Sequence, residues 1–255
     1  MIRSDCLIVV LCIVLIGGCA ASREAAEASG RVDYDPIEPF NRTIYGINDT
    51  IDRYTLKPLA RGYRNVVPSP VRRSVGNFSD NLLTPRSALN GFLQGSPEKG
   101  LSDLSRFILN TVFGIGGLFD VASYAGLEEY NETFSQTLAV WGLPEGPYVY
   151  LPIFGPNSLL DALTLPIDFY SDPLAYYDDD TARRWIYFVR TVDLRARLLA
   201  AEALIEDSPD PYITVRESYL QNRTFQIHDG DPPVEEDEFL NEFLNEAYEE
   251  YEEEE

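Results

Sequence analysis

Residues 35–54 have the sequence DPIEPFNRTIYGINDTIDRY, which predicts an amphipathic helix. Asp35 is a typical N-cap residue, and Pro36 is tolerated at the first helical position. Apolar residues then recur every three or four positions, which places them on one face of a helix. These residues are Ile37, Phe40, Ile44, Ile47, Ile51 and Tyr54. The pair Lys57-Pro58 is expected to end this helix.

The rest of the chain repeats this spacing in segments separated by Pro and Gly, so a mainly helical fold is expected. Further helices are predicted at about 70–93, 97–112, 134–141, 157–170, 179–206 and 212–227. A short apolar element is expected at 118–127. Residues 142–155 begin with Gly-Leu-Pro-Glu-Gly-Pro and become β-leaning at Tyr148, which predicts a hairpin-like loop. Such a loop is either a moving part or a rigid connector.

The formal net charge is −22, and it is distributed unevenly. Residues 229–255 hold 14 acidic residues and no Lys or Arg, whereas the body before them is mildly acidic. Neither part attracts nucleic acid at long range, so no nucleic-acid partner is expected. The acidic tail also has an apolar helical face, made of Phe239, Leu240, Phe243, Leu244, Ala247, Tyr248 and Tyr251. A short helix is marginal alone in water, which favours docking on a partner over packing on its own body.

The N-terminus has the pattern of a lipoprotein signal. Residues 1–18 contain Arg3 and an apolar run from Cys6 to Ile16 that is too short to span a bilayer. Leu15-Ile16-Gly17-Gly18 leads directly to Cys19, whose thiol would carry the lipid after cleavage. An ordinary secretory signal with a chance cysteine is the competing interpretation. Ala20 favours the outer membrane, and residues 19–33 are predicted to form a flexible tether.

The sequence contains no recognisable catalytic motif. Its three cysteines all lie in the first 19 residues, and His228 is its one histidine. There is no G-x-S-x-G, H-E-x-x-H or Walker A pattern, so no catalytic residue, metal or cofactor is expected. Gly114-Ile115-Gly116-Gly117 is weak evidence for a phosphate loop, because no strand precedes it. A helix terminator or a close packing site is the preferred interpretation.

Several ordered motifs resemble the MlaA (VacJ) family of outer-membrane lipoproteins, over residues 35–227. They are Asp35-Pro-Ile-Glu-Pro-Phe-Asn-Arg42, Asn77-Phe78, Asn81-Leu82, Asn90-Gly-Phe-Leu-Gln-Gly95, Arg106-Phe107, Asn110-Thr111, Gly114-Ile-Gly-Gly-Leu-Phe-Asp120, Gly146-Pro-Tyr-Val149, Leu151-Pro152, Asp210-Pro-Tyr212, Val215-Arg-Glu217 and Tyr219. The resemblance implies a ring-like, all-α domain at 34–228, embedded in the outer membrane around an amphipathic channel. The short hairpin-like loop and the acidic tail helix at 229–255, both predicted from the residues themselves, complete this expected architecture.

The resemblance implies a transport function without catalysis. Phospholipids would leave the outer leaflet through the channel and pass to a soluble periplasmic carrier (MlaC-like), and trimeric porins would be further partners. A charged headgroup loses its water at high cost in an apolar bilayer, so a polar channel suits this task. The alternatives are a structural porin-associated lipoprotein that moves no lipid, and an outer-membrane phospholipase.

The resemblance also implies roles for particular residues. The channel loop and its hinge correspond to Gly142, Pro144, Gly146 and Tyr148, with Pro144 standing where the family pattern suggests another glycine. The N-terminal gating helix corresponds to Phe40, Asn41, Arg42, Tyr45 and Asn48. The carrier would dock on the tail residues Phe239, Leu240, Phe243, Leu244 and Tyr248. Leu160 precedes Asp161 where the family often has Arg, so a polar contact is expected to be missing there.

Overall fold

The computed structural model describes residues 35–232, apart from the side chains of residues 203 and 204. The predicted signal peptide, the lipidated Cys19, the tether and the apolar face of the tail lie outside the described residues. Contacts divide the chain into a first unit ending at Tyr219 and a second beginning at Leu220. Each unit is described by itself below.

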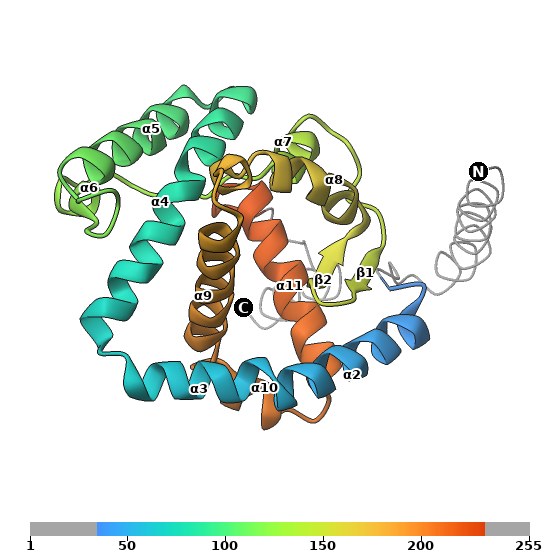
Figure 1. Cartoon of the computed structure of the whole chain (residues 1–255). Coiled ribbons are helices and arrows are strands. Elements are labelled where there is room, and N and C mark those ends of the chain that lie inside the picture. Colours follow the sequence, from blue (N-terminus) through green and yellow to red (C-terminus); the bar gives the residue numbers. More distant parts are fainter. Residues whose placement is uncertain (1–34, 233–255) are drawn as a thin grey trace, which may run out of the picture. The chain divides into compact units, whose positions relative to one another are not determined.

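The first unit is mostly helical and contains one two-stranded hairpin (Figure 1). Strand β1 (Tyr148–Leu151) pairs antiparallel with β2 (Gly155–Ser158), with Tyr148 opposite Ser158. The helices are α2 (Glu38–Tyr54), α3 (Leu56–Val66), α4 (Ser69–Leu93), α5 (Pro97–Val112), α6 (Val121–Tyr124), α7 (Phe134–Val140), α8 (Leu159–Tyr170), the 3-10 helix η1 (Pro173–Tyr176), α9 (Asp180–Leu198), α10 (Glu202–Glu206) and α11 (Pro211–Ile227). Helix α11 continues from the first unit into the second.

The structure corrects the predicted ends of the first helix. Its N-cap is Ile37, which makes no side-chain cap, and Pro39 rather than Pro36 lies in the first turn. The Asp35 carboxylate is buried and accepts a hydrogen bond from Asn41 instead of capping. The first helix ends at Tyr54, before the predicted end at Lys57-Pro58, and an unpredicted helix, α3, starts at Leu56. Pro58 lies in the first turn of α3, where its missing N–H costs no helical hydrogen bond.

Two further boundaries differ from the prediction. The helix expected at 179–206 is interrupted after Leu198, and a separate α10 starts at Glu202. The helix expected from residue 157 begins at Leu159, because residues 155–158 form the second strand. The predicted start of α9 is confirmed, since the Asp179 carboxylate accepts hydrogen bonds from the N–H groups of Thr181 and Ala182.

Helices α4 and α5 form an antiparallel pair joined by a tight turn, and they make the most extensive contact between elements (Figure 1). Helix α3 packs on α9, which also contacts α4. The hairpin lies against α2 through β1, while α8 contacts both strands and α7. The N-terminal helix and the hairpin are therefore neighbours, although more than 90 residues separate them in sequence.

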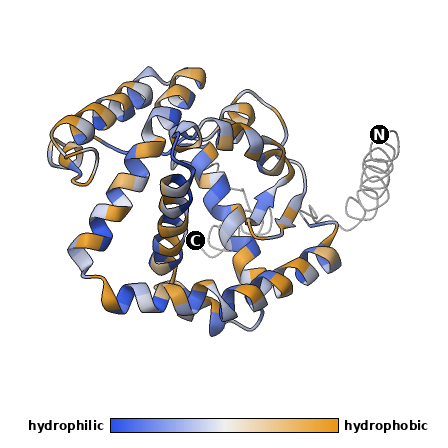
Figure 2. Cartoon of the chain, in the orientation of Figure 1, coloured by the Kyte–Doolittle hydropathy of each residue, from blue (hydrophilic) through white to orange (hydrophobic). Residues whose placement is uncertain are grey.

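The polarity of the fold is inverted relative to a water-soluble domain. Within residues 35–232, buried polar and charged residues outnumber buried apolar ones. Most of the large apolar side chains on α2 and α5 are exposed. Hydrophobic and hydrophilic residues alternate along both helices, as the orange and blue segments in Figure 2 show. On α5 the exposed residues are Leu101, Leu104, Ile108 and Val112, and the buried ones include Asp103, Arg106 and Asn110. Since water-soluble proteins rarely expose such contiguous apolar faces, these faces are suited to lipid or to a partner.

None of the helices in residues 35–232 is both long enough and apolar enough to cross a bilayer. The exposed apolar residues are instead distributed as one face on each of several helices, with polar groups behind them. Polar groups buried in this way need hydrogen-bond or ion-pair partners within the protein, as in any low-dielectric environment.

Candidate functional site

Asn41 joins helix α2 to strand β1. Its Nδ2 donates to the carbonyl oxygen of Tyr148 at 3.1 Å, and its Oδ1 accepts from the N–H of Tyr150 at 2.9 Å. A single amide thus pairs with the strand as a neighbouring strand would. The same Nδ2 donates to Asp35 at 2.7 Å, and the Asn41 side chain is fully buried. All its polar atoms have partners, so its removal would leave several buried groups unpaired.

Asn48 repeats this arrangement two turns further along α2. It donates to the carbonyl oxygen of Leu151 at 2.9 Å and accepts from the N–H of Ile153 at 3.0 Å. Asn41 and Asn48 are seven residues apart and therefore lie on one face of the helix. We call these two residues the asparagine clamp. The clamp fixes the position of the hairpin along α2 at both ends of β1.

Tyrosine rings pack around the clamp. Tyr45, one turn after Asn41, makes edge-on contacts with Tyr150 and Tyr212 at centroid distances of 5.5 and 5.7 Å. Tyr148 contacts the rings of Tyr150, Tyr212 and Tyr219. Burial raises the pKa of the Tyr148 hydroxyl above its ordinary value. Among the described residues no group forms a hydrogen bond with this hydroxyl, which is unusual for a buried polar atom.

Arg42 connects α2 to the start of α11. Its guanidinium binds Asp210 through two nitrogens, at 2.8 and 3.2 Å, and lies 4.5 Å from the centre of the Tyr212 ring. Asp210 also accepts from the N–H groups of Tyr212 and Ile213 and so caps α11. The hydrogen bond from Arg42 lowers the pKa of Asp210. Buried Asp35 accepts a hydrogen bond from the Tyr212 hydroxyl, which provides a second link.

The loop before β1 is held to helix α8. The carbonyl oxygens of Glu145 and Pro147 accept from the N–H groups of Leu160 and Leu159, each at 3.0 Å. The first N–H groups of α8, which have no helical partner, are satisfied in this way. Gly142 and Gly146 have φ values of 92° and 73°, in the left-handed region that favours glycine. The two predicted hinge glycines are thus required by the backbone, and Pro144 lies between them.

Asp161 has a polar partner of its own, and the expected loss of a polar contact at Leu160 stays a prediction. The Tyr219 hydroxyl donates to the Asp161 carboxylate, and the Ser158 N–H donates to the same hydroxyl. Tyr219 thereby joins α11 to the end of the hairpin and the start of α8.

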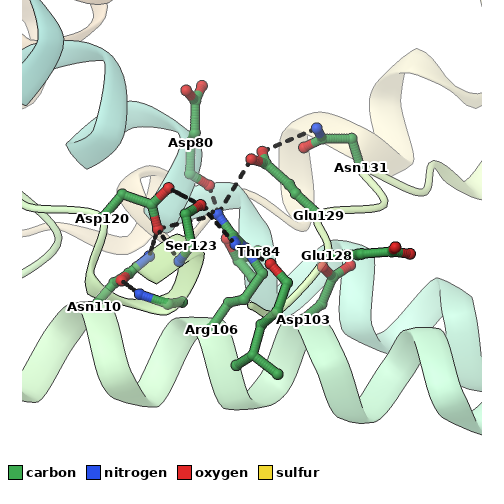
Figure 3. A network of polar contacts seen from close by, with 12 residues as sticks. Asp80, Thr84, Asp103, Arg106, Asn110, Asp120, Ser123, Glu128, Glu129 and Asn131 are labelled. Atoms are coloured by element: carbon green, nitrogen blue, oxygen red, sulfur yellow. Dashed lines mark hydrogen bonds and ion pairs between the residues drawn. The ribbon is translucent and has the colours of Figure 1, made fainter. Parts of the chain in front are cut away.

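A buried arginine organises the segment after α5, and sequence reasoning gave it no role (Figure 3). Arg106 donates to Asp120 at 3.1 Å, to Glu129 at 3.3 Å and to the carbonyl oxygen of Leu127 at 2.7 Å. Asn110, one turn later, donates to Asp120 and accepts from the N–H of Ala122. A signal was present, because Asp103, Arg106 and Asn110 recur at helical spacing opposite the apolar stripe.

A second buried network joins the α4–α5 pair to the start of α7. Ser87 donates to Asp103 at 2.5 Å and accepts from the N–H of Glu132 at 2.6 Å. Lys99 forms an ion pair with Glu132 at 2.9 Å, and Thr137 donates to Asn90 at 2.9 Å. Polar contacts thus replace an apolar core between these helices.

The glycine cluster at 114–117 ends helix α5. The N–H groups of Gly116 and Gly117 donate to the carbonyl oxygens of Thr111 and Asn110 at the helix end. A Cβ at Gly114 would lie 2.1 Å from the Phe119 carbonyl oxygen, so no side chain fits there. This supports the terminator and close-packing interpretation over a phosphate loop.

The described residues contain no group of three or more His, Cys, Asp or Glu side chains that could hold a metal ion. His228 in the second unit is exposed, and its Nδ1 lies 2.9 Å from the carbonyl oxygen of Thr224 in its own helix. The polar groups described above are engaged in structural contacts rather than arranged around a reacting atom.

The sequence pattern of the MlaA lipoprotein family matches residues 33–226. This chain belongs to the MlaA lipoprotein family. It is 37% identical over 222 residues to the intermembrane phospholipid transport system lipoprotein MlaA of Escherichia coli K12, covering 85% of this chain and 86% of that protein. The Haemophilus influenzae protein of the same name is 35% identical over 229 residues, covering 88% of this chain and 90% of its own length.

A solved structure with a similar fold agrees with this membership. It was described as the structural basis for maintenance of bacterial outer membrane lipid asymmetry. It superposes with a TM-score of 0.66 at 39% sequence identity, over 76% of this chain and 98% of that one. The resemblance seen in the sequence is thereby confirmed, as is a mostly helical fold with a hairpin. The MlaA family is non-enzymatic, in agreement with the prediction that this chain is not an enzyme.

The structure brings together only some of the residues to which the MlaA resemblance assigned roles. Asn41, Tyr45 and Asn48 contact the hairpin, at Tyr148, Tyr150 and Leu151. Arg42 instead binds Asp210. Phe40 lies on the exposed apolar face, with 55% of its surface accessible. The loop residues Gly142, Pro144 and Gly146 precede the strand that the clamp holds.

Proposed function

We propose that this MlaA-family chain lies in the outer membrane and gives outer-leaflet phospholipids a polar route toward a periplasmic carrier. The observation that carries the proposal is the inverted polarity of the helices. Ile108 and Val112 are 51% and 65% exposed, whereas Arg106 and Asn110 on the other face of the same helix are buried. Lipid chains could cover Ile108 and Val112 without desolvating any polar group, whereas Arg106 and Asn110 already have polar partners within the protein.

The route itself follows from the chemistry of a phospholipid. The headgroup needs polar surroundings while the acyl chains remain in apolar ones, and no covalent bond has to change. The ring-like architecture, with an amphipathic channel at its centre, is part of this proposal. Support comes from polar side chains behind the apolar faces and from the Escherichia coli and Haemophilus influenzae relatives, which are named phospholipid transport system lipoproteins.

We further propose that the asparagine clamp sets the state of the channel loop. Asn41 and Asn48 hold β1 by its backbone, and the loop with Gly142, Pro144 and Gly146 leads directly into that strand. A shift of α2 would therefore move the hairpin with it. This coupling supports a gating role for the N-terminal helix.

The remaining partners belong to the proposal as well. Lipidated Cys19 would anchor the chain through the tether at 19–33, after removal of the signal at 1–18. The apolar face of the acidic tail would dock the periplasmic carrier, and the exposed apolar faces of the body would adjoin trimeric porins. A structural lipoprotein that only scaffolds porins would use the same exposed faces, so it remains the second candidate.

The test is the phospholipid content of the outer leaflet. A strain lacking its own MlaA-family protein is complemented with this chain or with an empty vector, and surface phospholipid is measured with a membrane-impermeant amine reagent. The proposal predicts more labelled phospholipid with the empty vector than with this chain. Equal labelling, at matched protein and porin levels, would favour the scaffold instead.

A further inference from the structure

Helices α3, α4 and α9 of the first unit enclose an open cavity of about 390 Å³. This size falls in the range of small-ligand sites, which is about 300–1,000 Å³. The ionisable side chains on its wall are four arginines and two aspartates: Arg64, Arg72, Arg73, Arg197, Asp80 and Asp193. The wall therefore carries a net charge of +4 − 2 = +2, in a chain whose formal net charge is −22.

Part of this wall is held rigidly. Arg197 forms ion pairs with Asp80 at 3.2 Å and with Asp193 at 3.1 Å, and Asp193 accepts a hydrogen bond from Tyr63 at 3.0 Å. Arg72 donates through one nitrogen to the carbonyl oxygens of residues 64 and 67, at 2.5 and 2.7 Å. Both guanidinium groups are thus positioned before any ligand arrives, which reduces the entropy lost on binding.

The other two arginines, Arg64 and Arg73, have no carboxylate within ion-pair distance among residues 35–232. The same is true of Arg72, which binds only backbone oxygens. Arg64 and Arg73 are both exposed. Three cations without an acidic partner, around one cavity of an acidic protein, leave a local excess of positive charge that favours an anion.

Small residues keep the cavity open beside these charges. Gly76 of α4 faces the guanidinium of Arg197, since a Cβ at this position would lie 3.6 Å from its Cζ. Ala196 of α9 and Ala200, just after the end of α9, line the same cavity. Larger side chains at these positions would fill the space next to the arginines.

We propose that this cavity binds the phosphate of a phospholipid headgroup during its passage, an inference that rests on the proposed transport function. Arginine suits this ligand because its planar fork matches phosphate oxygens and its charge does not depend on physiological pH. Arg72 and Arg197 would set the position of the phosphate, and Arg64 and Arg73 would neutralise its charge. The acyl chains would leave through the open side of the cavity.

The test is direct binding to the full chain purified in a non-ionic detergent. Dihexanoyl phosphatidylglycerol is titrated by calorimetry into the wild type, the Arg64→Gln/Arg73→Gln variant and a matched control, Arg53→Gln/Arg184→Gln. The control removes the same charge from exposed arginines outside the cavity. Loss of two charge-assisted contacts is expected to weaken binding at least about tenfold in the cavity variant, with the control within about twofold of wild type.

A second titration separates the two sources of phosphate. Inorganic phosphate is expected to compete weakly with the short-chain lipid, since it offers anionic phosphate oxygens without the glycerol backbone and acyl chains. Lipid binding that is unchanged in the cavity variant would overturn the proposal. So would tight binding of inorganic phosphate that the lipid cannot displace, because the cavity would then be a free-phosphate site.

The same variants in cells distinguish this inference from the function on which it rests. If wild type lowers outer-leaflet phospholipid and the cavity variant does so equally well, transport stands and the headgroup site is wrong. If wild type itself has no effect, the proposed function fails, whatever the calorimetry gives. The inference predicts that wild type and control lower surface phospholipid, and that the cavity variant does so less.

Discussion

The Nδ2 atom of Asn41 lies 3.1 Å from the carbonyl oxygen of Tyr148, a residue 107 positions further along the chain. With the return hydrogen bond from the Tyr150 N–H, one side chain pairs with the free edge of a strand. The helix that begins the described chain and the hairpin near its middle are thereby joined through backbone groups. Under the proposed function, this contact would couple the residues assigned to gating with those assigned to the channel loop.

Replacing Asn41 with Ala should destabilise the protein by about 2–3 kcal/mol, because it leaves a buried carbonyl, a buried N–H and Asp35 short of a partner. Asn48→Ala is the matched comparison, since Asn48 makes the same two types of bond at a partly exposed site, and it should cost about 1 kcal/mol. Thermal unfolding in detergent shows which of the two variants loses more stability. Equal losses for the two variants would contradict the special role of Asn41.

Removing the hydroxyl of Tyr148 should not destabilise the protein. Tyr148→Phe keeps the ring contacts with Tyr212 and Tyr219 and eliminates a buried hydroxyl that has no partner among the described residues. The expected change is between zero and a gain of about 1 kcal/mol, since an unpaired buried polar group carries a desolvation penalty. Unfolding curves compared with those of Tyr150→Phe test this. A clear loss of stability would mean that the Tyr148 hydroxyl has a partner outside residues 35–232.

The two hinge glycines should respond differently to alanine. Both have positive φ, which costs an L-residue roughly 1–2 kcal/mol. At Gly146 a Cβ would also lie 3.0 Å from the Cβ of Leu159, whereas at Gly142 it would meet no atom within 4 Å. Gly146→Ala is therefore expected to lower the melting temperature more than Gly142→Ala. The reverse order would show that the loop does not keep this conformation.

Glu202 should make stability depend on pH in the acidic range. It lies 2.7 Å from Lys57 and 2.9 Å from Arg195, which itself binds Asp52. Burial opposes its ionisation, but the hydrogen bonds from Lys57 and Arg195 outweigh burial and lower its pKa. A lowered folded-state pKa contributes stability above the unfolded-state value, about 4.3, and this stability is lost as pH falls through the folded-state pKa.

The variant Glu202→Gln should therefore be less stable at pH 7, by about 1–3 kcal/mol, because two cations lose a charged acceptor. It should also lose less stability than wild type on acidification. Asp207→Asn is the control, since Asp207 is exposed and close in sequence. Melting temperatures from pH 3 to pH 7 test both points. A variant whose pH profile runs parallel to that of wild type would show that Glu202 is not the group responsible.

Much of the fold could be predicted from local signals. The spacing of Leu101, Leu104, Ile108 and Val112 predicts α5, and Asp179 predicts the start of α9. The same spacing cannot tell which face meets solvent, because periodicity shows only which residues share a face. Helix α3 was missed because Pro58 was taken as a terminator, although a proline in the first turn breaks no hydrogen bond.

The candidate site was predictable only in part. Gly142 and Gly146 were assigned through the family resemblance. Their positive φ values explain why glycine stands at both positions, and their hinge role stays a prediction. The asparagine clamp could not be derived from spacing, since each amide binds backbone atoms more than 100 residues away. Arg106 was missed although it shares a helix face with Asp103 and Asn110. Only the fold shows that this polar face is buried and that Asp120 and Glu129 lie around Arg106.

The most direct test of the account is whether the exposed apolar faces lie in lipid. Residues 35–232 contain no cysteine, so a single introduced cysteine can carry a spin label on the body. Labels at Ile108→Cys and Leu104→Cys are compared with one at Asp207→Cys, in purified protein reconstituted into phospholipid vesicles. The account predicts that the two α5 labels collide readily with oxygen and poorly with a water-soluble nickel chelate, and that the Asp207 label does the opposite. Equal access of the chelate to all three positions would contradict it.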